Sequence, residues 1–93
     1  MGTKVSENVE QRRFELPING EALAAAYYRL DNGRIVLIHT EVPAEFSGQG
    51  IASLLAQGTF ELLRQSGRKA VLRCPFMGRF LVKHPEYADI VAG

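Results

Sequence analysis

The chain has 93 residues, a formal net charge of +1 and one cysteine, so it is long enough for one domain and too short for two. This charge balance gives no global signal for binding nucleic acid or an anionic membrane, and no apolar stretch approaches the roughly 20 residues that span a bilayer. The N-terminus also lacks the apolar segment of a signal peptide, so we expect a soluble, cytoplasmic protein.

The first predicted strand spans residues 9–16, where apolar and polar side chains alternate weakly before Pro17. The residues before it carry no pattern that would anchor them. We therefore expect residues 1–8 to be disordered and residues 9–93 to form the single domain.

Two further strands are predicted over residues 21–30 and 34–42. The alanines of the first segment also allow a helix, but hairpin signals at Asn19-Gly20 and Asp31-Asn32-Gly33 on either side favour a strand. The second segment is apolar, rich in β-branched side chains, and stops at Pro43. Three antiparallel strands result.

The second half of the chain alternates between helix and strand. A first helix begins near Gly50 and stops at Ser66-Gly67, a short strand spans residues 70–74, and a second helix spans residues 76–83. The apolar stripe of the first helix comprises Ile51, Leu54, Leu55 and Leu62, with Gly58 beside it. The order βββ-α-β-α predicts an α+β fold with a mainly antiparallel sheet, and a right-handed crossover over residues 34–74.

The junction between the third strand and the first helix predicts an anion site. Gly48 and Gly50 let the backbone bend and approach a ligand closely, and the first turn of a helix offers free N–H groups and about half a positive charge. A dinucleotide fingerprint would need a third glycine where Ser53 stands, and a nucleotide P-loop would need Gly-Lys-Ser/Thr. A phosphate is the favoured ligand, and an ordinary turn is the alternative.

These residues resemble the acetyl-coenzyme A signature of the GCN5-related N-acetyltransferases, in which Arg/Gln-x-x-Gly-x-Gly/Ala opens a helix. Here the segment reads Ser47-Gly48-Gln49-Gly50-Ile51-Ala52. The segments His39-Thr40-Glu41-Val42-Pro43, Cys74-Pro75-Phe76 and His84-Pro85-Glu86-Tyr87 resemble the very small, single-domain branch of that family, sometimes called the YjdJ type. Ser47 departs from the Arg or Gln of the pattern, which removes one side-chain contact to the pyrophosphate and leaves the backbone contacts.

The resemblance implies a route for acetyl-coenzyme A. Backbone N–H groups of residues 48–53 would hold the pyrophosphate, and the pantetheine arm would lie between the strand that ends at Val42 and the strand that ends at Cys74. The second helix offers an aromatic pair beside a basic pair that could hold the anionic end, although both could instead serve the core and the solvated surface. The expected cofactor-binding residues are Glu41, Val42, Ser47, Gly48, Gln49, Gly50, Ile51, Ala52, Ser53, Cys74, Phe76, Phe80 and Lys83, with Arg79 completing the basic pair.

Acetyl transfer to an amine requires a neutral nitrogen, and a lysine-like amine is only about 0.04% neutral at pH 7. A general base must correct this. Glu41 and His39 share one face of their strand by period-2 alternation, so they are the catalytic candidates. A paired carboxylate and a structural histidine are the alternatives.

Cys74 is the third catalytic candidate, because its thiolate could accept the acetyl group before the amine does. A lone cysteine at the end of a buried strand is more often an inert apolar side chain, although His84 could approach it through the fold. It cannot form an internal disulfide, and the sequence has no Cys or His cluster for a metal. Tyr87 could protonate the leaving thiolate, or it could pack against the core.

The resulting hypothesis is an acetyl-coenzyme A-dependent N-acetyltransferase with direct attack of a primary amine, either of a small molecule or of a protein. A weakly catalytic or non-catalytic coenzyme A-binding module is the alternative, because three strands, two helices and one short strand leave little material for an acceptor pocket. A purely structural interaction domain is a third possibility. The identity of the acceptor cannot be read from the residues.

Overall fold

The computed structural model describes residues 5–48 and 50–92. One five-stranded sheet has the order β1-β2-β3-β4-β5, in which β1 to β4 form an antiparallel meander and β5 runs parallel to β4. The elements are β1 (Ser6–Asn8), β2 (Arg13–Pro17), β3 (Leu23–Asp31), β4 (Arg34–Glu41), the 3-10 helix η1 (Ala44–Phe46), α1 (Ile51–Gln65), β5 (Ala70–Leu72), α2 (Pro75–Lys83) and the 3-10 helix η2 (Pro85–Ile90). The predicted α+β fold is confirmed.

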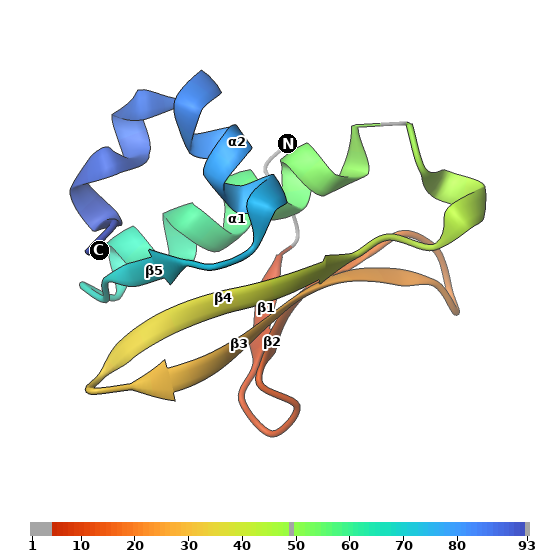
Figure 1. Cartoon of the computed structure of the whole chain (residues 1–93). Helices are drawn as coiled ribbons and strands as arrows, with labels where there is room; N and C mark the ends of the chain where they lie inside the picture. The colour runs from red at the N-terminus through yellow and green to blue at the C-terminus, as the bar shows by residue number, and fades with distance from the viewer. Residues whose placement is uncertain (1–4, 49, 93) are drawn as a thin grey trace.

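The helices cover one face of the sheet and leave the other face uncovered (Figure 1). Alternate residues of β3 and β4 point into the core on the helix side. The alanine-rich segment is a strand, as predicted, and its small side chains let α1 pack close to the sheet. The largest fully buried side chains include Phe14, Ile35, Leu37, Leu55, Phe60, Leu63 and Met77.

The stripe predicted for α1 is wrong in part. Leu54 is 46% exposed, whereas the buried face runs through Leu55, Thr59 and Leu63, which lie four residues apart. Leu62 is only partly buried. The apolar residues at the start of α1 therefore serve a surface near the glycine junction rather than the core alone.

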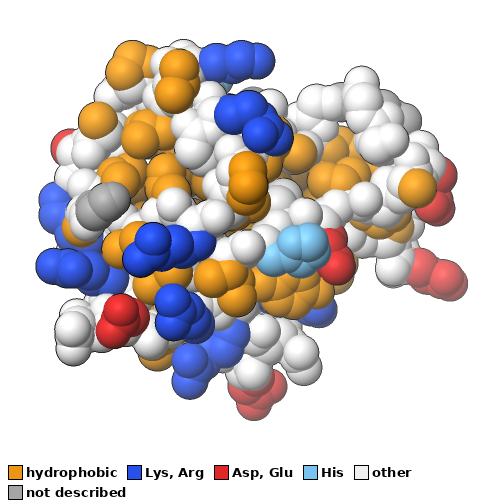
Figure 2. All heavy atoms as spheres, in the orientation of Figure 1, with side chains coloured by type: hydrophobic (Ala, Val, Ile, Leu, Met, Phe, Trp, Pro, Cys, Tyr) orange, Lys and Arg blue, Asp and Glu red, His pale blue; other side chains and the backbone are white. Residues whose placement is uncertain are grey.

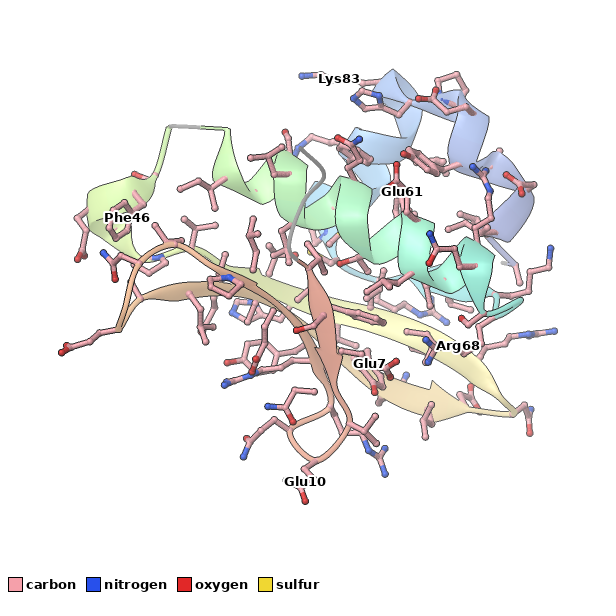
Figure 3. The ribbon with its side chains drawn as sticks, turned by 180° about the vertical axis from the view of Figure 1, so that it is seen from behind. Glu7, Glu10, Phe46, Glu61, Arg68 and Lys83 are labelled. Carbon is pink, nitrogen blue, oxygen red and sulfur yellow. The ribbon has the colours of Figure 1, made fainter. Side chains whose placement is uncertain are left out.

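The N-terminal prediction is wrong for residues 6–8, because they form β1 and pair with β2. Glu7 holds this strand: Tyr28 Oη donates to Glu7 Oε2 at 2.5 Å, and the Arg68 guanidinium donates to both carboxylate oxygens at 2.8 and 3.1 Å. Figure 3 shows Glu7 and Arg68 pointing toward one another. These partners lie far away in sequence, so no local apolar pattern announces the strand.

This cluster shifts the pKa values of all three of its members, and the hydrogen bond with Glu7 raises the pKa of Arg68. The hydrogen bond from Arg68 lowers the pKa of Glu7 against the opposing effect of burial. Burial, followed by the hydrogen bond to Glu7, raises the pKa of Tyr28 to about 12. The protonated tyrosine and the ionised glutamate are therefore the forms that this corner of the fold stabilises.

Candidate functional site

A β-bulge in β4 decides which side chains reach each face of the sheet. Tyr28 pairs with Leu37 but Tyr27 pairs with His39, so Ile38 is an extra residue in β4. Before the bulge, Leu37 points into the core. After it, the odd-numbered residues His39 and Glu41 point away from the core and Thr40 points toward the helices.

The reversal places the predicted base candidates on the uncovered face. His39 Nε2 lies 3.1 Å from Glu41 Oε2, which confirms that the two side chains share a face. Their side chains are 58% and 61% exposed. The His39 ring stacks on Tyr27 with a centroid separation of 6.0 Å, and Arg13 Nη1 donates to the Tyr27 hydroxyl at 3.2 Å. A neighbouring aromatic ring and a carboxylate thus orient the imidazole.

The strands β4 and β5 separate beyond their third residue pair. Their parallel ladder ends at Leu37 and Leu72, and the N–H groups of Arg73 and Cys74 both donate to the Leu37 carbonyl at 2.9 Å. Pro75 then begins α2, while β4 continues to Glu41. Within the described residues, no strand pairs with this last part of β4 on the β5 side. An extended ligand could bind the main-chain groups in this gap.

Cys74 and Thr40 meet on the helix side of the gap. The Cys74 Sγ atom lies 3.3 Å from Thr40 Oγ1, and Cys74 is buried. His84 stacks on Phe80 at a centroid separation of 4.3 Å and lies near Glu86. Because Cys74 and His84 flank opposite ends of α2, the histidine does not pair with the thiol.

The loop between β4 and α1 presents an uncapped helix N-terminus. Gly48 and Gly50 have φ values of +81° and +75°, which disfavour residues with a Cβ. A Cβ built on either glycine meets nothing within 4 Å, so the space in front of them is open. Gly50 caps α1 without a side chain, and the first turn holds no acidic residue. The free backbone N–H groups of the first turn of α1, together with the helix dipole, favour binding of an anion here.

A hollow of about 290 Å³ lies against this loop. Figure 2 shows apolar side chains beneath this loop, and Figure 3 labels Phe46 of η1, which is one of the lining residues. The Ser47 hydroxyl donates to the Ala44 carbonyl at 3.0 Å and so stabilises η1. The hollow is lined by Val42, Phe46, Ser47, Gly48, Gly50, Ile51, Ala52, Ser53 and Phe76.

A second hollow of about 100 Å³ adjoins the first and shares Ser53 and Phe76 with it. Arg79 and Lys83 of α2 line it, so cations stand beside an aromatic wall, as the spacing in the sequence predicted. Its remaining lining residues are Phe80 and His84. Phe80 is mostly buried and also packs against Phe60, so it serves the core and the hollow together.

The structure therefore brings together most of the predicted cofactor residues around two joined hollows. Gln49 lies outside the described residues. Glu41 and Cys74 line neither hollow and instead lie on the two sides of the gap beside them. Phe46 was missed, because nothing in its sequence context separates it from a core phenylalanine. Binding by these residues stays a prediction.

Tyr87 packs against the core and does not line the gap between β4 and β5. Its hydroxyl donates to Glu61 Oε2 at 3.1 Å, and its ring packs against Phe60 and Phe80. Burial, followed by the hydrogen bond to Glu61, raises its pKa. The packing alternative for Tyr87 fits this arrangement.

No group of His, Cys, Asp and Glu side chains over residues 5–48 and 50–92 could hold a metal ion. Among the same residues, no helix has the length and apolar character needed to cross a membrane.

Comparisons with known proteins agree on one family. A sequence model described as GCN5-related N-acetyl-transferase matches residues 13–90. Protein NATD1 of Mus musculus is 32% identical over 84 residues, covering 88% of this chain and 76% of NATD1. Protein NATD1 of Danio rerio is 28% identical over 90 residues, covering 92% and 82%.

A solved structure gives the same result. The solution structure of a GCN5-like protein from Staphylococcus aureus superimposes with a TM-score of 0.71 at 29% identity, over 99% of this chain and 90% of that protein. The match covers the sheet and the helices together.

Proposed function

Because this chain belongs to the GCN5-related N-acetyltransferase family, we propose that it uses acetyl-coenzyme A to acetylate a primary amine by direct transfer. The observation that carries the proposal is the gap between β4 and β5, which adjoins the hollow under the glycine loop. An extended thioester ligand with an anionic end fits a slot of this kind beside a helix N-terminus.

The residues around the hollow suit the cofactor. The N–H groups at the start of α1 would hold the pyrophosphate, since Gly50 leaves them without a side-chain cap. Open space in front of Gly48 and Gly50 would let the phosphates approach the backbone. Arg79 and Lys83 would hold the anionic adenosine end in the second hollow.

Glu41 would act as the general base. Its carboxylate accepts the proton of the incoming ammonium group, and His39, 3.1 Å from Glu41 Oε2, orients that carboxylate. Acetyl-coenzyme A would supply the activated acetyl group: the neutral amine nitrogen bonds to the carbonyl carbon, the C–S bond breaks, and the thiolate leaves and takes up the second proton that the nitrogen gives up. Cys74 would line the gap from the helix side, with its Sγ atom engaged by Thr40.

Two measurements test this proposal. Isothermal titration calorimetry with coenzyme A tests the site, and thiol release from acetyl-coenzyme A in the presence of a panel of amines tests the reaction. Binding together with amine-dependent thiol release is the expected result. The absence of binding at millimolar coenzyme A would overturn both the enzyme and the binding-module hypotheses.

A coenzyme A-binding module with little turnover is the second candidate. The exposure of Glu41 and His39 favours it, because a base open to water gains little from desolvation. Binding without thiol release for any amine in the panel would favour this candidate.

A further inference from the structure

The uncovered face of the sheet carries an apolar strip between arginines. Val36, Ile38 and Val71 share this face, since Val36 pairs with Val71 and their neighbours Leu37 and Leu72 point into the core. Val36 is only 2% exposed and Val71 is partly buried, so Ile38 is the exposed member of the strip. Ile38 is 43% exposed at the bulge. Figure 1 shows that no helix covers this side, and Figure 2 shows Lys and Arg side chains grouped around apolar ones in the region of the sheet.

Three exposed arginines lie on this face, and Asp31 lies opposite one of them, Arg34, in the β3–β4 register. Arg29, Arg34 and Arg73 are exposed, and none forms an ion pair within the part of the chain that the structure describes. By contrast, Arg13 on the same face pairs with Glu15. An exposed positive cluster beside an apolar strip complements a segment that is acidic and partly apolar.

Arg73 stands at the gap itself. Its N–H donates to the Leu37 carbonyl, immediately before the bulge residue Ile38. Arg73 directly follows β5, whose last residue Leu72 packs against the core, and it is exposed, whereas Cys74 is buried on the helix side. We therefore place Arg73 on the uncovered face. His39 and Glu41 share the uncovered face. A group that enters the gap from this side therefore meets the Arg73 guanidinium and the His39–Glu41 pair together.

We propose that the uncovered sheet face binds the acceptor, and that the acceptor is an acidic protein segment whose lysine side chain enters the gap beside Arg73. This inference rests on the proposed acetyl transfer and adds the class of acceptor. The carboxylates of the segment contact the arginines, and its apolar side chains cover the strip. The positively charged lysine ammonium then faces the negatively charged carboxylate of Glu41, which lies beside His39.

The test uses short fluorescent peptides with one central lysine and a blocked N-terminus, flanked by glutamate, glutamine or arginine. Fluorescence anisotropy with the coenzyme A-saturated protein measures binding, and mass spectrometry with acetyl-coenzyme A measures acetylation. The glutamate-flanked peptide should bind and react best, with an advantage that shrinks as salt is raised.

Variants locate the contact. Arg73→Gln should weaken binding of the glutamate-flanked peptide about two- to fivefold, the size expected for one exposed charge pair, and Arg73→Lys should restore most of it. Arg12→Asn is the matched control, because it removes a charge from the β1–β2 turn and asparagine tolerates the positive φ of that position. It should leave peptide binding unchanged.

Three outcomes would overturn the inference: equal binding of all three peptides, an equal effect of Arg12→Asn and Arg73→Gln, or equally tight binding of a single-stranded oligonucleotide of the same charge. Calorimetry with coenzyme A separates these outcomes from a failure of the proposed function. If coenzyme A binds and the acidic peptide does not, only the acceptor inference fails.

Discussion

The Sγ atom of Cys74 lies 3.3 Å from Thr40 Oγ1, on the opposite face of β4 from the His39–Glu41 pair. The thiol therefore lies on the helix side of the gap, with a hydroxyl as its hydrogen-bond partner. This arrangement fits the proposal that Cys74 lines the gap while Glu41 accepts the proton.

We predict that Glu41→Gln lowers kcat about a hundredfold, because a general base contributes at least that much. Cys74→Ala should lower it less than tenfold, because a direct attack does not need the thiol. Initial rates of thiol release would measure both, with circular dichroism to check folding.

The chain supplies a matched control for Glu41. Glu86 is equally exposed and lies beside a histidine, 3.5 Å from His84 Nδ1, yet it belongs to η2 and lines neither hollow. Glu86→Gln should leave kcat unchanged. An acetyl adduct on Cys74, seen by mass spectrometry with acetyl-coenzyme A alone and lost when amine is added, would contradict direct transfer.

The second prediction concerns the glycine loop. Gly50→Val should abolish measurable coenzyme A binding, because a branched side chain would fill the open space in front of the helix N-terminus and strain a φ of +75°. Gly67→Val is the control: Gly67 has a φ of +71° and open space at the other end of α1. Both variants should lose similar stability, on the order of 1 to 2 kcal/mol, but calorimetry should find a loss of binding only for Gly50→Val. Equal affinities would place the anion elsewhere.

The sequence predicted the order of the main elements and the glycine junction, because turn residues and apolar periodicity are local signals. It also predicted that His39 and Glu41 share a face. It could not tell which face, since simple alternation from Leu37 would have directed both into the core. The extra residue Ile38 reverses the pattern, and bulges leave no periodic signal. β1 was missed for a related reason: Glu7 is held by Tyr28 and Arg68, which only the fold brings near.

The third prediction is a loss of stability at alkaline pH that depends on Tyr28. Its folded pKa is raised from 10 to about 12, so the unfolded chain loses this proton first. The contribution of Tyr28 is fully present below pH 10 and is lost as the pH rises toward 12. Urea unfolding across this pH range should show a smaller decrease in the free energy of unfolding for Tyr28→Phe than for wild type. The same comparison with Tyr87→Phe accounts for Tyr87, whose pKa is also raised. Parallel curves for wild type and Tyr28→Phe would contradict the assignment.

The fourth prediction concerns acid. The folded pKa of Glu7 is lowered, so its stabilising contribution is present above its ordinary value of 4.5 and is lost as the pH falls through the folded value. Glu7→Gln should therefore lose stability at neutral pH and show a flatter decrease in acid than wild type. Arg68→Gln should reproduce much of this change, because Arg68 is the main cause of the shift. Thermal unfolding between pH 7 and about 3 would measure it, and identical acid profiles for wild type and Glu7→Gln would exclude the role of this pair.

The last prediction is that coenzyme A affinity depends on Lys83 and on salt. Lys83 lines the second hollow and lies at the exposed end of α2 (Figure 3), where it forms no ion pair within the described residues. Lys83→Ala should cost on the order of 0.5 to 1 kcal/mol of binding free energy, as for one exposed charge pair, and should reduce the dependence of affinity on salt. Lys69→Ala is the control, since Lys69 lines a separate hollow beside Asp89 and Ile90. If both variants bind coenzyme A as wild type does, with the same salt dependence, the N–H groups of α1 hold the anion without help from α2.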